Sequence, residues 1–134
     1  MIQFDHYLKV YYKDIDQMGI VYYSRYFEFF EEARTELLDS IKLDVSTIED
    51  AGIQLPVITS HCEYKKSVIF EQSINIQTSI NEVPRSKLKI DYSIYSKGSS
   101  QLLAKGYTIH AFIKKTGRPV KAPKFILNKM EKYF

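Results

Sequence analysis

Hydrophobic and polar positions alternate at the start of the chain and then change to a longer period. Residues 4–12 alternate in this way, which predicts a strand. Its more apolar face consists of Phe4, Leu8, Val10 and Tyr12. From Ser24 to about Ile41, apolar side chains recur every three or four positions, which predicts a helix of about five turns. The apolar stripe of this helix consists of Tyr26, Phe30, Ala33, Leu37 and Ile41.

The remainder of the chain returns mostly to the two-residue period, interrupted by turns that contain glycine, proline or serine. A short helical turn is predicted from Asp44 to Gly52, where the glycine ends it. Residues 124–134 carry apolar positions at helical spacing, which predicts a short terminal helix or a packed tail. Four strands are predicted between these two segments, at residues 55–65, 73–80, 87–95 and 102–113.

The predicted order is therefore one strand, one long helix and four further strands in antiparallel succession. A helix with a wide apolar stripe has to bury that stripe, and the only large partner in the chain is one face of the sheet. We expect an α+β domain in which an antiparallel five-stranded sheet wraps around one long central helix. Such a sheet has exposed edges, which proteins usually pair or cover, so we also expect a homodimer or a homotetramer.

Length and composition limit the class of protein. With 134 residues and a hydrophobic content of 45%, the chain suits a single domain that spans residues 1–134. The first residues show no targeting pattern, and no apolar run approaches the roughly 18 to 20 residues that span a bilayer. The single cysteine, Cys62, cannot form an internal disulfide. These features predict a cytoplasmic protein with a reduced thiol and without membrane insertion.

The charges are nearly balanced, since 19 basic and 16 acidic residues give a formal net charge of +3. Such a small excess does not favour nucleic acid as a partner. Several basic residues nevertheless gather late in the chain, where they form either an ordinary solvated surface or a site for a phosphorylated ligand. This late basic cluster consists of Lys114, Lys115, Arg118, Lys121 and Lys124.

The segment with the most distinctive chemistry is residues 11–30, YYKDIDQMGIVYYSRYFEFF, in which two aspartates precede a glycine and the predicted helix. A carboxylate in this position can activate water or attack a carbonyl carbon. Backbone N–H groups at the start of a helix can stabilise negative charge on an oxygen atom. Ordinary turns and helix caps use the same residue types, so the pattern alone leaves a structural role for Asp14 and Asp16 open.

Residues 10–26 resemble the signature of the hotdog-fold acyl-CoA thioesterases, in the 4-hydroxybenzoyl-CoA thioesterase-like family and its YbgC-type branch. The helical segment 29–37, FFEEARTEL, and the turn 117–123, GRPVKAP, are similar to later parts of the same family. The resemblance implies a hotdog fold that hydrolyses an acyl thioester of CoA or of acyl carrier protein, in a homodimer or homotetramer. No nucleotide-binding motif accompanies it, so we expect no cofactor.

The resemblance also implies roles for individual residues. Asp16 corresponds to the catalytic carboxylate, either as the nucleophile or as the base that activates water. The backbone N–H of Tyr23 corresponds to the donor that polarises the thioester carbonyl. Many members of the branch have histidine where this chain has Tyr23, so a role for an imidazole is not expected there. The residues that we expect to bind substrate are Gly19, Val21, Tyr22, Tyr26, Arg118 and Lys121.

The other candidate residues favour structural roles. Asp14 is expected on the same strand face as Asp16, in a solvated or turn-stabilising role. Cys62 has no partner base that would make it a nucleophile. The histidines lie far apart on three predicted strands, without the spacing of a metal site. They are His6, His61 and His110.

Two other functions remain open. A hotdog hydratase or dehydratase would act on similar thioesters, but such enzymes usually place a histidine beside an acidic residue, and no histidine occurs between His6 and His61. A non-enzymatic module that binds acyl-CoA or acyl carrier protein would hold thioesters without consuming them. Release of free thiol distinguishes hydrolysis from binding alone.

Overall fold

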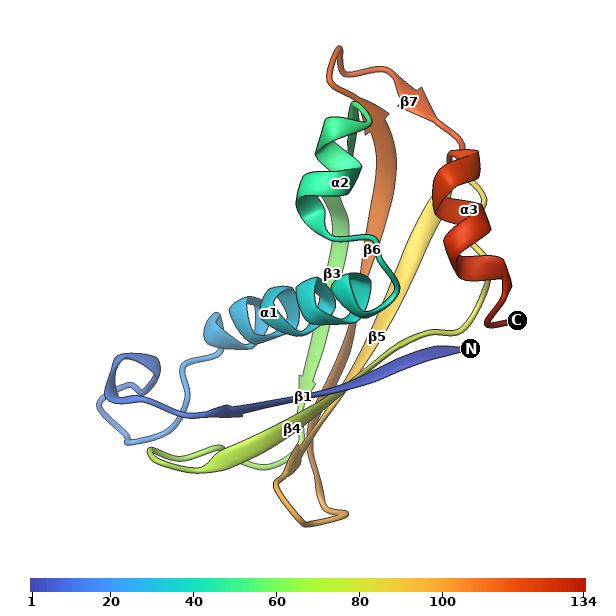
Figure 1. The fold of residues 1–134 in the computed structure, drawn as a ribbon. Coiled ribbons are helices and arrows are strands. Elements are labelled where there is room, and N and C mark those ends of the chain that lie inside the picture. The colour runs from blue at the N-terminus through green and yellow to red at the C-terminus, as the bar shows by residue number, and fades with distance from the viewer.

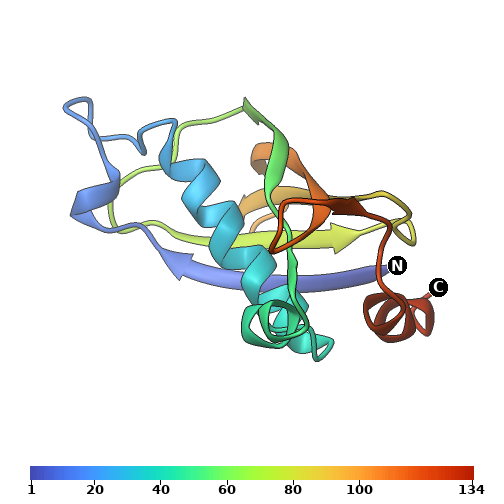
Figure 2. The same ribbon diagram turned by 90° about the horizontal axis from the view of Figure 1, so that it is seen from above.

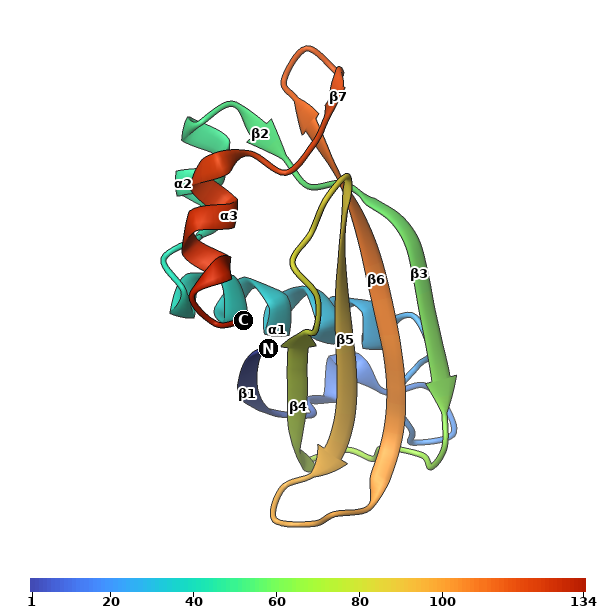
Figure 3. The same ribbon diagram turned by 90° about the vertical axis from the view of Figure 1, so that its right-hand side faces the viewer.

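The computed structural model describes residues 1–134, which form one curved antiparallel sheet with the helices packed against it (Figures 1 and 3). The first half of the chain contains β1 (Ile2–Lys9), the 3₁₀ helix η1 (Tyr12–Asp14), α1 (Arg25–Ser40), α2 (Val45–Asp50), β2 (Ile53–Gln54) and β3 (Val57–Tyr64). The second half contains β4 (Ser73–Ile80), β5 (Lys87–Ser96), β6 (Leu102–Lys114), β7 (Pro119–Val120) and α3 (Lys124–Glu131).

The sheet has seven strands instead of the expected five. The strands β1, β4, β5 and β6 lie side by side in that order, and β3 pairs with the other edge of β6. Two additional strands of two residues each, β2 and β7, pair with the last residues of β6. Such short pairings leave no alternating pattern in the sequence, which is why the strand count was wrong.

The four later strands do not pair in simple succession. β3 does not pair with β4, the strand that follows it, because the place beside β4 is taken by β1, from Ile2 opposite Ile80 to Lys9 opposite Ser73. The N–H groups of Lys65 and Lys66 both donate to the carbonyl of Leu103, which holds the chain at the end of β3 against β6. As a result β3 and β1 lie at opposite edges of the sheet.

The first strand ends earlier than expected. Alternation along β1 is confirmed, but the strand stops at Lys9 instead of continuing to residue 12, and Tyr12 is 76% exposed. Val10 still bonds to the chain near Gln72, and the following residues turn into η1. The aromatic side chains at positions 11 and 12 continued the apolar alternation although the backbone had already left the sheet.

The long helix is confirmed as α1, and every position of the predicted stripe is buried. Figure 2 shows that α1 lies obliquely across the strands on one side of the sheet. The ring of Phe30 stacks on Tyr92 of β5, with the ring centroids 4.2 Å apart. Gly106 of β6 allows this close approach, because a Cβ there would lie 2.9 Å from the Phe30 ring and 2.2 Å from the carbonyl oxygen of His61.

The short predicted helices are present as α2 and α3. Asp44 caps α2, because its Oδ2 accepts a hydrogen bond from the N–H of Thr47 at 3.3 Å. The chain termini lie close together (Figure 1), and the amino group of Met1 donates to the carbonyl oxygen of Tyr133 at 2.6 Å. None of the helices combines the length and apolar character needed to cross a membrane.

Candidate active site

The loop between β1 and α1 folds back on itself and so carries Asp16 to the start of the helix. The N–H of Asp16 donates to the carbonyl oxygen of Ile20 at 2.9 Å, and the N–H of Gly19 donates to the carbonyl oxygen of Asp16 at 3.0 Å. Gly19 has a φ of +78°, a conformation that glycine adopts without the steric cost of a side chain. The glycine therefore closes the turn that holds Asp16.

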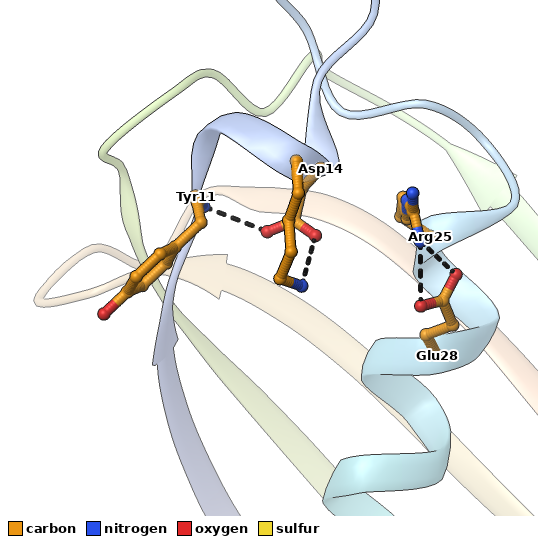
Figure 4. Close-up of polar contacts among 5 residues, drawn as sticks. Tyr11, Asp14, Arg25 and Glu28 are labelled. Atoms are coloured by element: carbon orange, nitrogen blue, oxygen red, sulfur yellow. Dashed lines mark hydrogen bonds and ion pairs between the residues drawn. The ribbon is translucent and has the colours of Figure 1, made fainter.

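Asp14 has a different role from Asp16. The residue is 3% exposed, its Oδ2 accepts the N–H of Tyr11 at 2.9 Å, and Nζ of Lys13 donates to its Oδ1 at 3.1 Å (Figure 4). The expectation that Asp14 stabilises the turn is therefore confirmed, and the alternative, that its side chain is solvated, is wrong. The expectation that Asp14 and Asp16 share a strand face is also wrong, because η1 replaces the strand at this position.

The carboxylate of Asp16 is only partly engaged. Its Oδ1 accepts the N–H of Met18 at 2.8 Å, whereas no group of the chain donates to Oδ2. One oxygen therefore fixes the orientation of the carboxylate, and the other remains available to a ligand or a water molecule.

The helix start offers free donors. Ser24 occupies the N-cap position, but its hydroxyl makes no capping bond, and its backbone is already helical. The N–H of Arg25 donates to the carbonyl oxygen of Tyr22 at 2.9 Å, but the N–H groups of Tyr23 and Ser24 have no acceptor in the chain. At the positive end of a 16-residue helix these two groups suit a negatively charged oxygen.

The charged side chains of the first helical turn do not occupy these donors. Both carboxylate oxygens of Glu28 contact Nη1 of Arg25, at 2.9 and 3.0 Å (Figure 4). Glu28 is thus committed to an ion pair along the helix surface. The N–H groups of residues 23 and 24 are therefore not occupied by either of these charged side chains.

A pocket of about 310 Å³ brings most of the predicted site residues together. Five expected residues line it, namely Asp16, Val21, Tyr22, Tyr23 and Tyr26. Gly19 does not line the pocket but forms its supporting turn. The remaining walls consist of Ile20, Tyr64, Lys65, Lys66 and Ser67. The pocket therefore joins a carboxylate, a helix start, aromatic rings and two lysines.

Arg118 and Lys121 do not border this pocket within one chain. Tyr64, in the pocket wall, pairs with Ala104 near the start of β6, whereas Arg118 bonds to Lys114 at its end. At about 3.3 Å per residue these ends lie about 30 Å apart along the strand. The late basic cluster is therefore found on and after the β6–β7 hairpin, away from Asp16.

Five wall residues were missed from the sequence, namely Ile20 in the predicted loop and Tyr64, Lys65, Lys66 and Ser67 at the end of β3 and after it. Tyr64 is the last residue of β3, and the pairing of β3 with β6 sets where this strand end and the residues after it lie. The ring of Tyr64 packs edge-on against Tyr26, with the centroids 4.8 Å apart. No local pattern in the sequence predicts this contact, because it joins segments that are far apart along the chain.

Burial changes the protonation behaviour of several groups beside the pocket. Desolvation raises the pKa of Tyr26 and of Tyr64 to about 12, so both hydroxyls remain neutral donors near neutral pH. Desolvation likewise raises the pKa of the Cys62 thiol to about 11. A thiol with this pKa is a poor nucleophile at neutral pH, which argues against a catalytic role for Cys62.

No histidine lines the pocket, and each of the three has another environment. His6 contacts Glu32 of α1, and His61 stacks on Tyr107. His110 is buried, its Nδ1 bonds to the carbonyl oxygen of Leu55, and its Nε2 lies 2.9 Å from the Thr108 hydroxyl. The chain contains no group of three or more histidine, cysteine or acidic side chains that could hold a metal ion.

Known proteins share this fold and sequence pattern. The family model of the thioesterase-like superfamily matches residues 10–130. A putative esterase of Aquifex aeolicus is 31% identical over 119 residues, which cover 89% of this chain and 91% of that protein. The acyl-CoA thioesterase YbgC of Haemophilus influenzae is 34% identical over 77 residues, which cover 57% of each chain.

The structural comparison agrees with the sequence comparison. The crystal structure of the DHNA-CoA thioesterase of Staphylococcus aureus superimposes with a TM-score of 0.89 and 25% identity, over 99% of this chain and 89% of that one. The resemblance to hotdog thioesterases is thereby confirmed, and so is the α+β class with an antiparallel sheet. The chain belongs to the thioesterase-like superfamily.

Proposed function

We propose that this protein is an acyl-CoA thioesterase that hydrolyses an acyl thioester to a carboxylic acid and free CoA thiol. One observation carries the proposal. A carboxylate with a free oxygen, on Asp16, shares a pocket with Tyr23, whose backbone N–H has no acceptor in the chain. Thioester hydrolysis needs both a carboxylate that delivers an oxygen to the carbonyl carbon and a donor for the oxygen that becomes negative.

In the proposed reaction the thioester oxygen accepts the Tyr23 N–H at the positive end of α1. If Asp16 attacks, its Oδ2 forms a mixed anhydride with the acyl carbon while the carbon–sulfur bond breaks. The thiolate takes up a proton, and water hydrolyses the anhydride to restore the carboxylate. If Asp16 acts as a base, it removes a proton from water as the oxygen adds to the carbonyl carbon, and the departing sulfur receives that proton.

The remaining wall residues suit an acyl group near the reacting atoms. Val21, Tyr22 and Tyr26 offer apolar surface beside Asp16, and the ring of Tyr22 lies against that of Tyr23 with the centroids 4.5 Å apart. In this proposal Gly19 acts indirectly, by allowing the turn that places Asp16. A panel of acyl-CoA substrates determines which acyl group the protein hydrolyses.

The carrier is proposed to bind through basic residues. Lys65 and Lys66 line the pocket and carry the positive charge that the phosphates of CoA require. Arg118 and Lys121 keep a proposed role in phosphate binding, but at about 30 Å along β6 they would act across the interface of a paired subunit. An acyl carrier protein presents the thioester on a phosphopantetheine arm with a single phosphate and serves as the alternative carrier in the assay.

The active unit is proposed to be a homodimer or homotetramer. β3 bonds to β6 along one edge only, and Val57 and Ile58 of this strand are 44% and 49% exposed. An open strand edge with exposed apolar side chains favours pairing with a second copy. In such an assembly each pocket would receive residues from two chains.

The proposal is tested by incubating the purified protein with a panel of acyl-CoAs of different chain length and aromatic character, and with acyl carrier protein thioesters. Free thiol is measured with a colorimetric reagent, and products are checked by mass spectrometry. Catalytic release of thiol with at least one substrate is expected. Saturable binding of acyl-CoA without thiol release would instead identify a binding module. A product that differs from the substrate by one water and keeps its thioester would identify a hydratase or dehydratase.

A further inference from the structure

Tyr64, the last residue of β3, forms a hydrogen bond from the sheet to the helix start. Its hydroxyl donates to the carbonyl oxygen of Tyr23 at 3.3 Å, although the two residues are 41 positions apart. The Tyr64 ring rests edge-on against Tyr26, and both rings line the Asp16 pocket. The contact therefore fixes the position of the Tyr64 hydroxyl beside the proposed oxyanion donors.

The carbonyl that Tyr64 contacts belongs to the same peptide group as the N–H of Ser24, which has no acceptor in the chain. A hydrogen bond to a peptide carbonyl polarises the group and strengthens its N–H as a donor. It also fixes the plane of the peptide, and thereby the direction of that N–H.

The two peptide groups at the helix start are held unequally. The carbonyl of Tyr22, which shares a peptide with the Tyr23 N–H, accepts the N–H of Arg25 at 2.9 Å. The carbonyl of Tyr23 accepts the N–H of Tyr26 only at 3.4 Å, a long distance for such a bond. The Tyr64 hydroxyl is the side-chain donor to the second peptide, at 3.3 Å, whereas no side chain donates to the first.

The two free N–H groups point toward a common region. The bonds from Arg25 to Tyr22 and from Tyr26 to Tyr23 show that the chain already turns helically from Tyr22. Successive N–H groups in a helical turn point toward its N-terminus, so those of Tyr23 and Ser24 face the same way. One oxygen in front of the helix can accept from both.

We propose that Tyr64 is a positioning residue, which orients and polarises the Tyr23–Ser24 peptide so that the Ser24 N–H becomes a second oxyanion donor beside that of Tyr23. This inference rests on the proposed thioesterase function. Tyr64 does not touch the reacting atoms in this account. Two aligned donors stabilise a developing negative charge better than one, and loss of a donor of this kind lowers turnover strongly.

The test is Tyr64→Phe, which removes the hydroxyl and keeps the ring against Tyr26. Turnover on the best acyl-CoA should fall about threefold to tenfold, the effect of losing one long hydrogen bond, with KM and melting temperature unchanged. The kcat pH profile should keep its shape and move down as a whole, because no titrating group is removed from the reaction. Tyr107→Phe is the matched control, since Tyr107 lies on the neighbouring β6 and stacks on His61. It should retain wild-type kcat.

Three results would overturn the inference. Wild-type kcat in Tyr64→Phe would mean that the hydroxyl does not support the donor, and a raised KM with unchanged kcat would make Tyr64 a binding residue. Loss of the alkaline limb of the pH profile would make it a proton donor instead. Failure of the proposed function is recognised separately, by the absence of thiol release from the wild-type protein or by full activity of Asp16→Asn, and would remove the basis of this inference as well.

Discussion

The N–H of Tyr22 donates to the carbonyl oxygen of Asp14 at 3.0 Å, which ties the turn after β1 to the start of α1. This bond, together with the bond from Asp16 to Ile20, closes the loop that carries the catalytic carboxylate of the proposed mechanism. The backbone of Asp14 therefore holds the front of α1, and its buried side chain holds the turn from the other side. The site depends on a loop whose geometry is fixed by hydrogen bonds at both ends.

The side chain of Asp14 should contribute to stability and not to chemistry. Asp14→Ala leaves the N–H of Tyr11 without its partner, so the free energy of unfolding should fall by about 1–2 kcal/mol. Asp14→Asn retains an acceptor oxygen and should cost less. Urea unfolding followed by circular dichroism measures both. Equal stability of Asp14→Ala and the wild type would show that this contact does not hold the turn.

Any side chain introduced at Gly19 should destabilise the turn, because the backbone conformation at this position is unfavourable for residues other than glycine. Gly19 has a φ of +78°, and a Cβ at this position would meet no atom within 4 Å. Gly19→Ala should therefore lose about 1–2 kcal/mol through conformational strain, without a steric clash. It should also lower kcat, because the strained turn displaces Asp16.

Gly98 provides a matched control for this effect. It has a φ of +76°, it also lacks neighbours for a Cβ, and it lies in the turn between β5 and β6. Gly98→Ala should lose similar stability in thermal unfolding and keep full turnover. If both variants lost kcat equally, the effect at Gly19 would reflect general destabilisation.

Charge removal tests each of the two basic regions for a role in binding the phosphates of CoA. Lys65→Gln with Lys66→Gln removes positive charge from the pocket wall, and Arg118→Gln with Lys121→Gln removes it from the late basic cluster. Each pair should raise KM for acyl-CoA with kcat preserved, more strongly at low ionic strength, because phosphate binding is screened by salt. Steady-state kinetics over a range of salt concentrations measures this. An unchanged KM for the second pair would assign Arg118 and Lys121 to ordinary solvated surface.

His110 should make the protein less stable in acid. Desolvation lowers the pKa of its imidazole in the folded protein, below the ordinary value of 6.5. As pH falls through 6.5 the unfolded chain therefore binds a proton that the folded chain does not, and the free energy of unfolding decreases. Urea unfolding between about pH 7 and pH 5.5 should show this decrease, and His110→Gln should weaken it.

His61 serves as the control because its side chain is exposed on β3. His61→Gln should retain the dependence of stability on pH. A wild-type unfolding free energy that stays constant as the pH falls would contradict the account of His110.

The sequence predicted those features whose information is local. The stripe from Tyr26 to Ile41 specifies both the existence of α1 and its buried face, because a helix brings side chains three and four positions apart together. The Asp16–Tyr23 segment was recognised from its resemblance to the thioesterase family, which a contiguous stretch of sequence can carry because turn, carboxylate and helix start follow one another directly. One of the two N–H groups that lack acceptors belongs to Tyr23 in that segment, and the other belongs to Ser24, the next residue.

Features that depend on distant segments could not be read in this way. The pairing of β3 with β6 brings Tyr64, Lys65 and Lys66 to the helix start, and nothing near these residues in the sequence specifies that pairing. The early end of β1 was missed because the buried carboxylate of Asp14 bends a chain whose aromatic side chains still alternate. The strands β2 and β7 were missed because two residues are too few for a period.

The catalytic role of Asp16 is tested most directly by the turnover of Asp16→Asn, measured by thiol release with the best acyl-CoA and compared with that of Asp14→Asn. The asparagine keeps the size of the side chain and an oxygen that can accept the Met18 N–H, but it cannot attack the thioester or remove a proton from water. We predict that kcat falls at least ~100-fold in Asp16→Asn, with stability and KM little changed, while Asp14→Asn keeps substantial activity. Turnover of Asp16→Asn close to that of the wild type would contradict the proposed mechanism.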